Sequence, residues 1–136
     1  MKTKKIAQLI REINYEGRAI STANAITEEE ELLLTLLLRK MNPASQAGLF
    51  VSEEELEKIL PDNRDSFDQA LQDLVNRLMN KIFSVDSAIK VGGTPLRAHC
   101  VWFQSIVPKD KDGVAGVEFL FTRQLMPFLI QLKKAI

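Results

Sequence analysis

The chain has few of the residue types that support covalent or metal chemistry. Its 136 residues include one cysteine (Cys100), one histidine (His99), one tryptophan and one tyrosine. A single cysteine excludes an internal disulfide framework and is typical of a protein of the reducing cytoplasm. Because His99 and Cys100 are neighbours in a predicted strand, their side chains point to opposite faces and cannot form a nucleophile–base pair.

Other absences narrow the function further. There is no glycine-rich phosphate loop, and no cysteine or histidine pair has metal-ligand spacing. The longest apolar run, residues 32–38, contains Thr35 and is too short to span a bilayer. The basic N-terminal residues precede an amphipathic stretch, so no signal peptide is expected. We therefore expect a cytoplasmic protein that is not an enzyme and has no cofactor, no metal and no membrane partner.

The net charge of the chain is zero, because 18 basic and 18 acidic residues cancel. This balance disfavours a freestanding nucleic-acid binder, which is usually strongly basic. The charges are nevertheless unevenly placed. Residues 28–73 contain twelve acidic and four basic residues, whereas residues 74–111 contain six basic and two acidic ones. Such a bipolar domain fits a modest phosphate-binding edge or docking onto a charged protein partner.

The first 25 residues are predicted to form a basic amphipathic arm and a linker. Apolar residues recur at helical spacing in residues 2–14, which predicts a short amphipathic helix. We expect it to pack on its own domain, and contact with DNA phosphates or a membrane surface are the alternatives. Residues 15–25 are rich in small and polar side chains and are predicted to be an irregular linker. The remaining chain, residues 26–136, is expected to form one domain.

Residues 26–136 show two helix starts with strong local signals. Thr27 with Glu30 and Ser52 with Glu55 have the spacing of capping boxes. The first helix is predicted to reach about Met41, and because leucines lie on most of its faces it should be covered on several sides. The other predicted elements are a strand at 48–51, an amphipathic helix at 63–81, a long strand at 96–107, a hairpin tip at 109–113, and a helix at 123–135 capped by Thr122.

The order helix, strand, helix, helix and β-meander predicts an α+β fold of the winged-helix type. In such a fold the third helix can enter the major groove of DNA and the hairpin forms the wing. The basic residues expected to contact DNA are Arg64, Arg77, Lys81, Lys109 and Lys111. Arg77 and Lys81, one helical turn apart, are expected to contribute more than the wing lysines, because Asp110 and Asp112 partly cancel the field of those lysines. A plain solvated helix face explains the same pattern.

Four stretches, in the same order, resemble the theta-type plasmid replication initiators. Residues 20–38 carry a polar lead-in and a threonine cap before an acidic, leucine-rich helix. Residues 67–83 and 102–106 continue the similarity. The most specific stretch is 117–129, in which a strand runs into a capped helix with a Leu-x-Pro-aromatic-Leu pattern.

The resemblance implies a role in plasmid DNA replication. Family members carry two tandem winged-helix domains, bind repeated origin sequences as monomers and bind an operator as dimers. This chain matches their first domain, which supplies auxiliary phosphate contacts and the dimer surface. Double-stranded DNA and a second copy of the chain are therefore the expected partners, and host replication proteins are further candidates.

The predicted dimer uses the long strand of the meander. An exposed strand edge can pair with a second copy, and Val101, Trp102 and Phe103 are the residues expected at that interface. Two alternatives stay open at this point. One is a standalone winged-helix transcriptional regulator, and the other is a protein–protein docking module that binds no nucleic acid.

Overall fold

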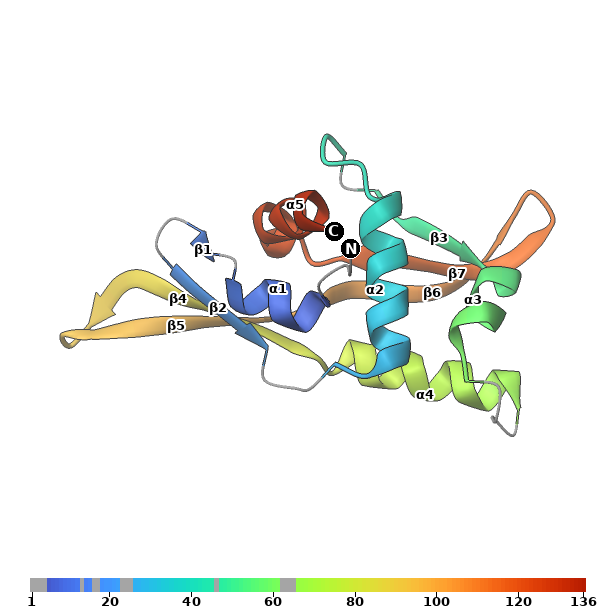
Figure 1. Cartoon of the computed structure of the whole chain (residues 1–136), viewed down its shortest axis with the longest axis horizontal. Helices are drawn as coiled ribbons and strands as arrows, with labels where there is room; N and C mark the ends of the chain where they lie inside the picture. The colour runs from blue at the N-terminus through green and yellow to red at the C-terminus, as the bar shows by residue number, and fades with distance from the viewer. Residues whose placement is uncertain (1–4, 13, 16–17, 23–25, 46, 62–65) are drawn as a thin grey trace.

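The computed structural model describes residues 5–12, 14–15, 18–22, 26–45, 47–61 and 66–136 (Figure 1). A short 3-10 turn, Arg123–Leu125, precedes the last helix. The helices and strands in chain order are α1 Ile6–Glu12, β1 Asn14–Tyr15, β2 Arg18–Thr22, α2 Glu28–Lys40, β3 Leu49–Ser52, α3 Glu53–Ile59, α4 Phe67–Met79, β4 Ile82–Val91, β5 Thr94–Val101, β6 Phe103–Lys111, β7 Val114–Phe121 and α5 Met126–Ala135.

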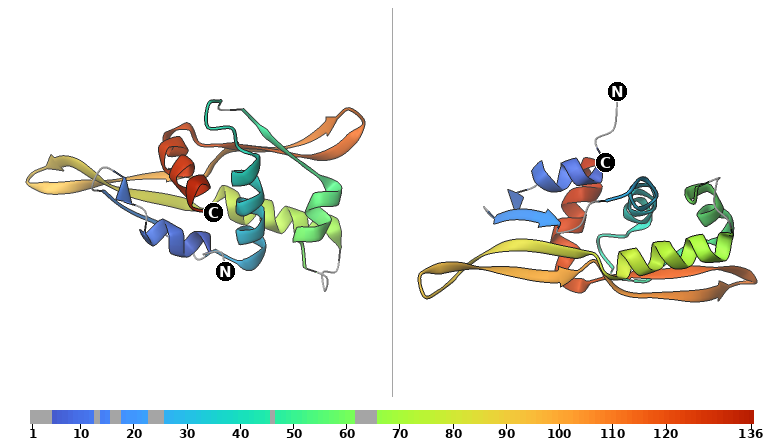
Figure 2. Two further views of the ribbon diagram at one scale, coloured as in Figure 1. Left: turned by 45° about the horizontal axis from the view of Figure 1, so that its top comes forward. Right: turned by 90° about the horizontal axis from the view of Figure 1, so that it is seen from below.

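The strands form two antiparallel sheets, with the orders β1-β2-β4-β5 and β3-β7-β6. Two long hairpins, β4–β5 and β6–β7, extend toward opposite ends of the molecule, and the helices lie on one side of them (Figure 2, right). Gly93 and Gly113 occupy the two hairpin turns with positive φ, a conformation that glycine adopts without steric penalty.

The predicted α+β winged helix is confirmed. Helices α2, α3 and α4 with the sheet β3-β7-β6 form its helix–strand–helix–helix–wing unit, and the β6–β7 hairpin is the wing. The β4–β5 hairpin is inserted between the third helix of this unit, α4, and the first strand of the wing. The single meander expected from the sequence is therefore two separate hairpins.

The long strand predicted at 96–107 is interrupted at Trp102, which belongs to neither sheet. Its backbone N–H donates to the carbonyl of Lys81, and its carbonyl accepts from the N–H of Thr122. The indole ring is fully buried and lies edge-on to Phe83, with 5.0 Å between the ring centroids. These two bonds tie Trp102 to the segments just after α4 and just after β7, at the point where the chain leaves the first sheet and enters the second.

The N-terminal helix packs on the domain, as the sequence predicted. Ile6, Leu9 and Ile10 are buried in the same apolar cluster as Leu33 of α2. The Ile6 N–H donates to the carboxylate of Glu31, so α2 also holds the first turn of α1 in place.

The prediction of an irregular linker at 15–25 was wrong for the residues that the structure describes. Strand β2 pairs antiparallel with β4, and Ile20 lies opposite Val85. The partner strand lies far away in the sequence, so the local composition of this segment gave no sign of the pairing.

Both predicted capping boxes are present. The Thr27 hydroxyl accepts from the N–H of Glu30 at 3.3 Å, and the Glu30 carboxylate accepts from the N–H of Thr27 at 2.8 Å. Ser52 and Glu55 make the same exchange at the start of α3. Thr122, by contrast, makes no side-chain capping bond, because the chain first forms the 3-10 turn and α5 begins later than predicted.

Candidate nucleic-acid interface

Helix α4 is the third helix of the winged-helix unit and the first candidate for contact with DNA. Leu74 and Leu78 are buried toward the core, and α4 contacts strand β6 of the wing. Its exposed face carries Asp68, Gln72 and Asp73 toward the N-terminal half and Arg77 in the last turn. The exposed face therefore presents two carboxylates and one cation to a duplex.

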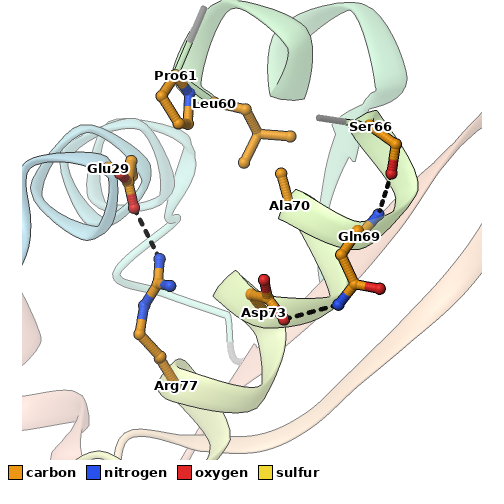
Figure 3. A pocket seen from close by; sticks show the side chains of 8 residues that line it. All are labelled: Glu29, Leu60, Pro61, Ser66, Gln69, Ala70, Asp73 and Arg77. Carbon is orange, nitrogen blue, oxygen red and sulfur yellow. Dashed lines mark hydrogen bonds and ion pairs between the residues drawn. The ribbon is translucent and has the colours of Figure 1, made fainter. Parts of the chain in front are cut away.

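Arg77 is already paired within the domain. Its Nη2 atom lies 2.7 Å from Oε2 of Glu29 on α2 (Figure 3). This ion pair lines a cavity of about 220 Å³ between the start of α2, the end of α3 and α4. On the other side of the same cavity, the Gln69 side-chain amide donates to Asp73 at 2.9 Å. Since Glu29 offsets the charge of Arg77, the attraction of this residue for a phosphate is reduced.

Lys81 does not lie on the exposed face of α4, and its assignment as a surface residue was wrong. The helix ends at Met79, and the Lys81 N–H bonds the carbonyl of Leu78 in the turn into β4. The side chain turns inward, where Lys81 is 3% exposed and its Nζ lies 3.0 Å from Oε2 of Glu30. Lys81 therefore cannot reach a phosphate in this fold.

Glu30 is the buried partner of that lysine and is 1% exposed. Burial alone would raise the pKa of its carboxyl. The hydrogen bond from the Thr27 backbone, together with the Lys81 ammonium and the Thr27 hydroxyl, outweighs burial and holds the pKa below its ordinary value. Glu30 is thus ionised at neutral pH and forms a buried ion pair with Lys81.

The two wing lysines lie on the face of the wing that points away from α4. Pro108 and Val117 are opposite each other in the sheet and line a groove against α4. Side chains alternate between faces along a strand, so Lys109 and Lys111 lie on the other face. Lys109 pairs there with Glu118 of β7. Lys111 lies over the ring of Phe50 on β3, with its Nζ 5.8 Å from the centroid.

The five basic residues therefore do not form one surface. Arg64 lies outside the described residues, Arg77 is paired, and Lys81 is buried. Only Lys109 and Lys111 share an exposed face, which we call the outer wing face, and they share it with the exposed Val107 and Val114. The alternation of side chains along the wing strands could have assigned Lys109 and Lys111 to one face from the sequence alone. The fold was needed to show that α4 covers the other face.

Two of the three predicted dimer residues are core residues. Trp102 and Phe103 are 0% exposed, so the prediction that they lie in an interface was wrong for the folded domain. Val101 is 39% exposed and lies opposite Ile82, which is 37% exposed. In the described part of the chain β5 pairs only with β4, and its other edge is open beside the exposed Leu96.

The other side chains that could take part in catalysis, Ser84, His99 and Cys100, lie on strands β4 and β5. The Ser84 hydroxyl lies 2.8 Å from Nδ1 of His99 across strands β4 and β5. Burial raises the pKa of the Cys100 thiol, so little of it is thiolate at neutral pH.

Among the described residues no group of three or more acidic, histidine or cysteine side chains is placed to hold a metal ion. No helix in these ranges is long and apolar enough to cross a membrane.

Comparisons with known proteins agree with this architecture. The family described as "Initiator Replication protein, WH1" matches residues 12–136. No curated protein matches the chain. Among solved structures, the crystal structure of the MSBI1.176 WH1 domain, a replication protein isolated from a multiple sclerosis patient, is similar with a TM-score of 0.52. The two are 21% identical, and the match covers 81% of this chain and 85% of that one. This likeness shows a shared fold.

Proposed function

Because the chain belongs to the initiator replication protein WH1 family, we propose that it serves plasmid replication by pairing two copies and contacting double-stranded DNA. The DNA is the repeated origin or the operator, and the site of action is the cytoplasm. The domain carries out no catalytic step in this role. It contributes phosphate contacts and dimerisation, and it does not by itself supply the main readout of bases.

The observation that carries the DNA part of the proposal is the outer wing face. Lys109 and Lys111 lie on one face of a hairpin that projects from the body of the molecule (Figure 1). A projecting basic hairpin suits contact with the phosphate backbone of a duplex. Glu118 pairs with Lys109, so we expect each lysine to contribute modestly and binding by this domain alone to be weak.

The pairing part of the proposal rests on the inserted hairpin. The open edge of β5 offers unpaired backbone groups to the same strand of a second copy. Val101 and Ile82 are neighbouring exposed apolar side chains on this hairpin, and a symmetric contact would bury both. A contact through this edge leaves the outer wing face of each copy free for DNA.

Fluorescence anisotropy with a labelled duplex over a salt series tests the DNA contact. The double variant Lys109→Ala/Lys111→Ala removes two phosphate contacts, so the slope of log K against log salt should become shallower by about two units. Arg39→Ala/Lys134→Ala is the matched control, because it removes two exposed basic side chains from α2 and α5. We expect this control to bind like wild type.

The same titration distinguishes the alternatives. If the wing double variant binds like wild type, the DNA-facing surface lies elsewhere on the domain. If wild type shows no salt-dependent binding at all, the domain is a docking module without a nucleic-acid role. Because Lys81 is buried against Glu30, only Arg77 of the α4 pair remains at the surface, and like Lys109 it is paired with a glutamate. We therefore now expect the two wing lysines together to contribute more than Arg77 and Lys81.

A further inference from the structure

A groove of about 310 Å³ lies between α4 and the wing, on the face opposite to Lys109 and Lys111. Figure 2 (right) shows α4 running along the β6–β7 hairpin. Leu71 and Val75 of α4 form one wall, and Ile106, Pro108 and Val117 of the sheet form the other. These five side chains are apolar, so the groove offers an apolar surface that the domain itself leaves partly uncovered.

The described polar residues that line this groove are acidic or neutral. They are Asp68 and Gln72 of α4, and none of the described lining residues is basic. Asp110 follows Pro108 by two positions on β6, so it lies on the same face of the wing, and it is exposed. A duplex placed here would bring its phosphates against two carboxylates, and the described lining residues supply no compensating cation. The groove is therefore suited to a partner other than DNA.

We propose that this groove docks an amphipathic helical segment of a partner protein that carries apolar side chains flanked by lysine or arginine. The apolar side chains enter between Leu71 and Pro108, and the basic ones pair with Asp68 of the lining and with Asp110 beside it on the wing. Asp110 accepts the Gly113 N–H through one carboxylate oxygen, and its negative charge stays available to a basic side chain. A volume of about 310 Å³ is at the lower end of the range for ligand pockets, so the groove admits a few side chains of a docked helix. The proposed docking surface is separate from the proposed DNA and dimer surfaces, because it uses the face of the wing that carries Pro108 and Val117 and lies against α4.

Nuclear magnetic resonance titration of the labelled chain with two synthetic peptides tests the proposal. One peptide carries leucines on one helical face and lysines on the other, and the second has glutamate in place of every lysine. We expect the lysine peptide to shift the amide signals of Leu71, Gln72, Val75 and Ile106. The glutamate peptide should bind at least tenfold more weakly.

Three surface variants of α4 assign the binding to the groove. Asp68→Lys reverses the charge at the groove and should weaken the lysine peptide at least fivefold. Gln72→Trp fills the groove with a larger side chain and should weaken the peptide to a similar extent. Asp73→Lys is the matched control, because Asp73 is exposed on the same helix but lines the other cavity. It should change the affinity less than twofold.

Four outcomes would overturn the proposal. The lysine peptide fails to bind at millimolar concentration, it shifts amides elsewhere, or it binds the Asp68→Lys and Asp73→Lys variants equally. The fourth is that a short DNA duplex, rather than the peptide, shifts the groove amides. Loss of DNA binding in the wing double variant has no bearing on these results, so this proposal and the proposed function can fail separately.

Discussion

Glu30 takes part in three interactions at the start of α2. Its carboxylate accepts from the Thr27 N–H, its own N–H bonds the Thr27 hydroxyl, and its Oε2 pairs with Lys81. Both members of this ion pair are almost fully buried. Removing Glu30 takes away the carboxylate that lies against the buried Lys81 ammonium, and breaking a buried ion pair costs much more than losing an exposed one.

Glu30→Gln should therefore lower the free energy of unfolding by about 3–5 kcal/mol. Glutamine keeps the size and one oxygen acceptor, so the loss reports mainly on the charge opposite Lys81. Glu29→Gln is the matched control, since it breaks only the more exposed pair with Arg77 and should cost about 0–1 kcal/mol. Urea denaturation at pH 7 measures both. Similar small losses in the two variants would contradict a buried pair.

Acid should destabilise the domain through Glu30 and Glu55, whose pKa values are both lower in the folded chain than the ordinary 4.5. A lowered folded pKa means that the stabilisation is complete above the unfolded value and is lost as the pH falls through the folded value. Melting temperatures measured from pH 7 to pH 3 should therefore drop below about pH 4.5. The melting temperature of Glu55→Gln should fall less steeply with pH than that of wild type. An identical pH profile would mean that Glu55 does not contribute to the acid sensitivity.

At the scale of elements, the local signals in the sequence were sufficient for the starts of α2 and α3 and for the buried stripe of α4. The capping boxes at Thr27 and Ser52 and the stripe of α4 depend on neighbours three or four positions away, and the structure contains all three. The strand β2 and the break at Trp102 depend on partners distant in the chain, so sequence periodicity did not reveal them.

The candidate interface was less predictable from the sequence than the helices. Lys81 fits the helical spacing of Arg77, yet α4 ends at Met79, before Lys81 is reached. The burial of Trp102 and Phe103 follows from packing against Phe83, Phe119 and Phe121, which come from other elements. Which face of the wing carries Lys109 and Lys111 became clear only when α4 was placed against the other face.

Leu74 tests the orientation of α4, because it lies in the middle of the stripe and is fully buried. Leu74→Ala removes apolar contacts and leaves a cavity, which should cost about 2–5 kcal/mol. Asn76→Ala, an exposed position on the same helix, should stay within about 0.5 kcal/mol of wild type. Denaturant melts of the three proteins measure this. A loss below about 0.5 kcal/mol for Leu74→Ala would mean that the helix turns another face to the core.

At the scale of the whole molecule, the two hairpins divide the proposed roles. The inserted hairpin β4–β5 and the wing extend toward opposite ends of the molecule, and the helices lie on one side of both (Figure 2). The inserted hairpin has an open strand edge, and the wing carries the exposed Lys109 and Lys111. Two copies joined at β5 would therefore carry their wings at the ends far from the contact.

A substitution at the open edge should separate the two copies. Val101→Lys places a charge opposite Ile82, and burying it in a symmetric contact would be unfavourable, so this variant should be monomeric. Val107→Lys is the matched control, because Val107 is an exposed valine on the wing and lies outside the β5 edge. It should keep the mass of wild type in size-exclusion chromatography with light scattering.

The same light-scattering measurement on wild type, with and without an operator duplex, tests the central claim most directly. At tens of micromolar we expect a mass twice the 15.4 kDa of one chain, and with the duplex a complex of two chains and one DNA. A monomer mass at every concentration, unchanged when the duplex is added, would contradict the claim that this domain pairs and contacts DNA.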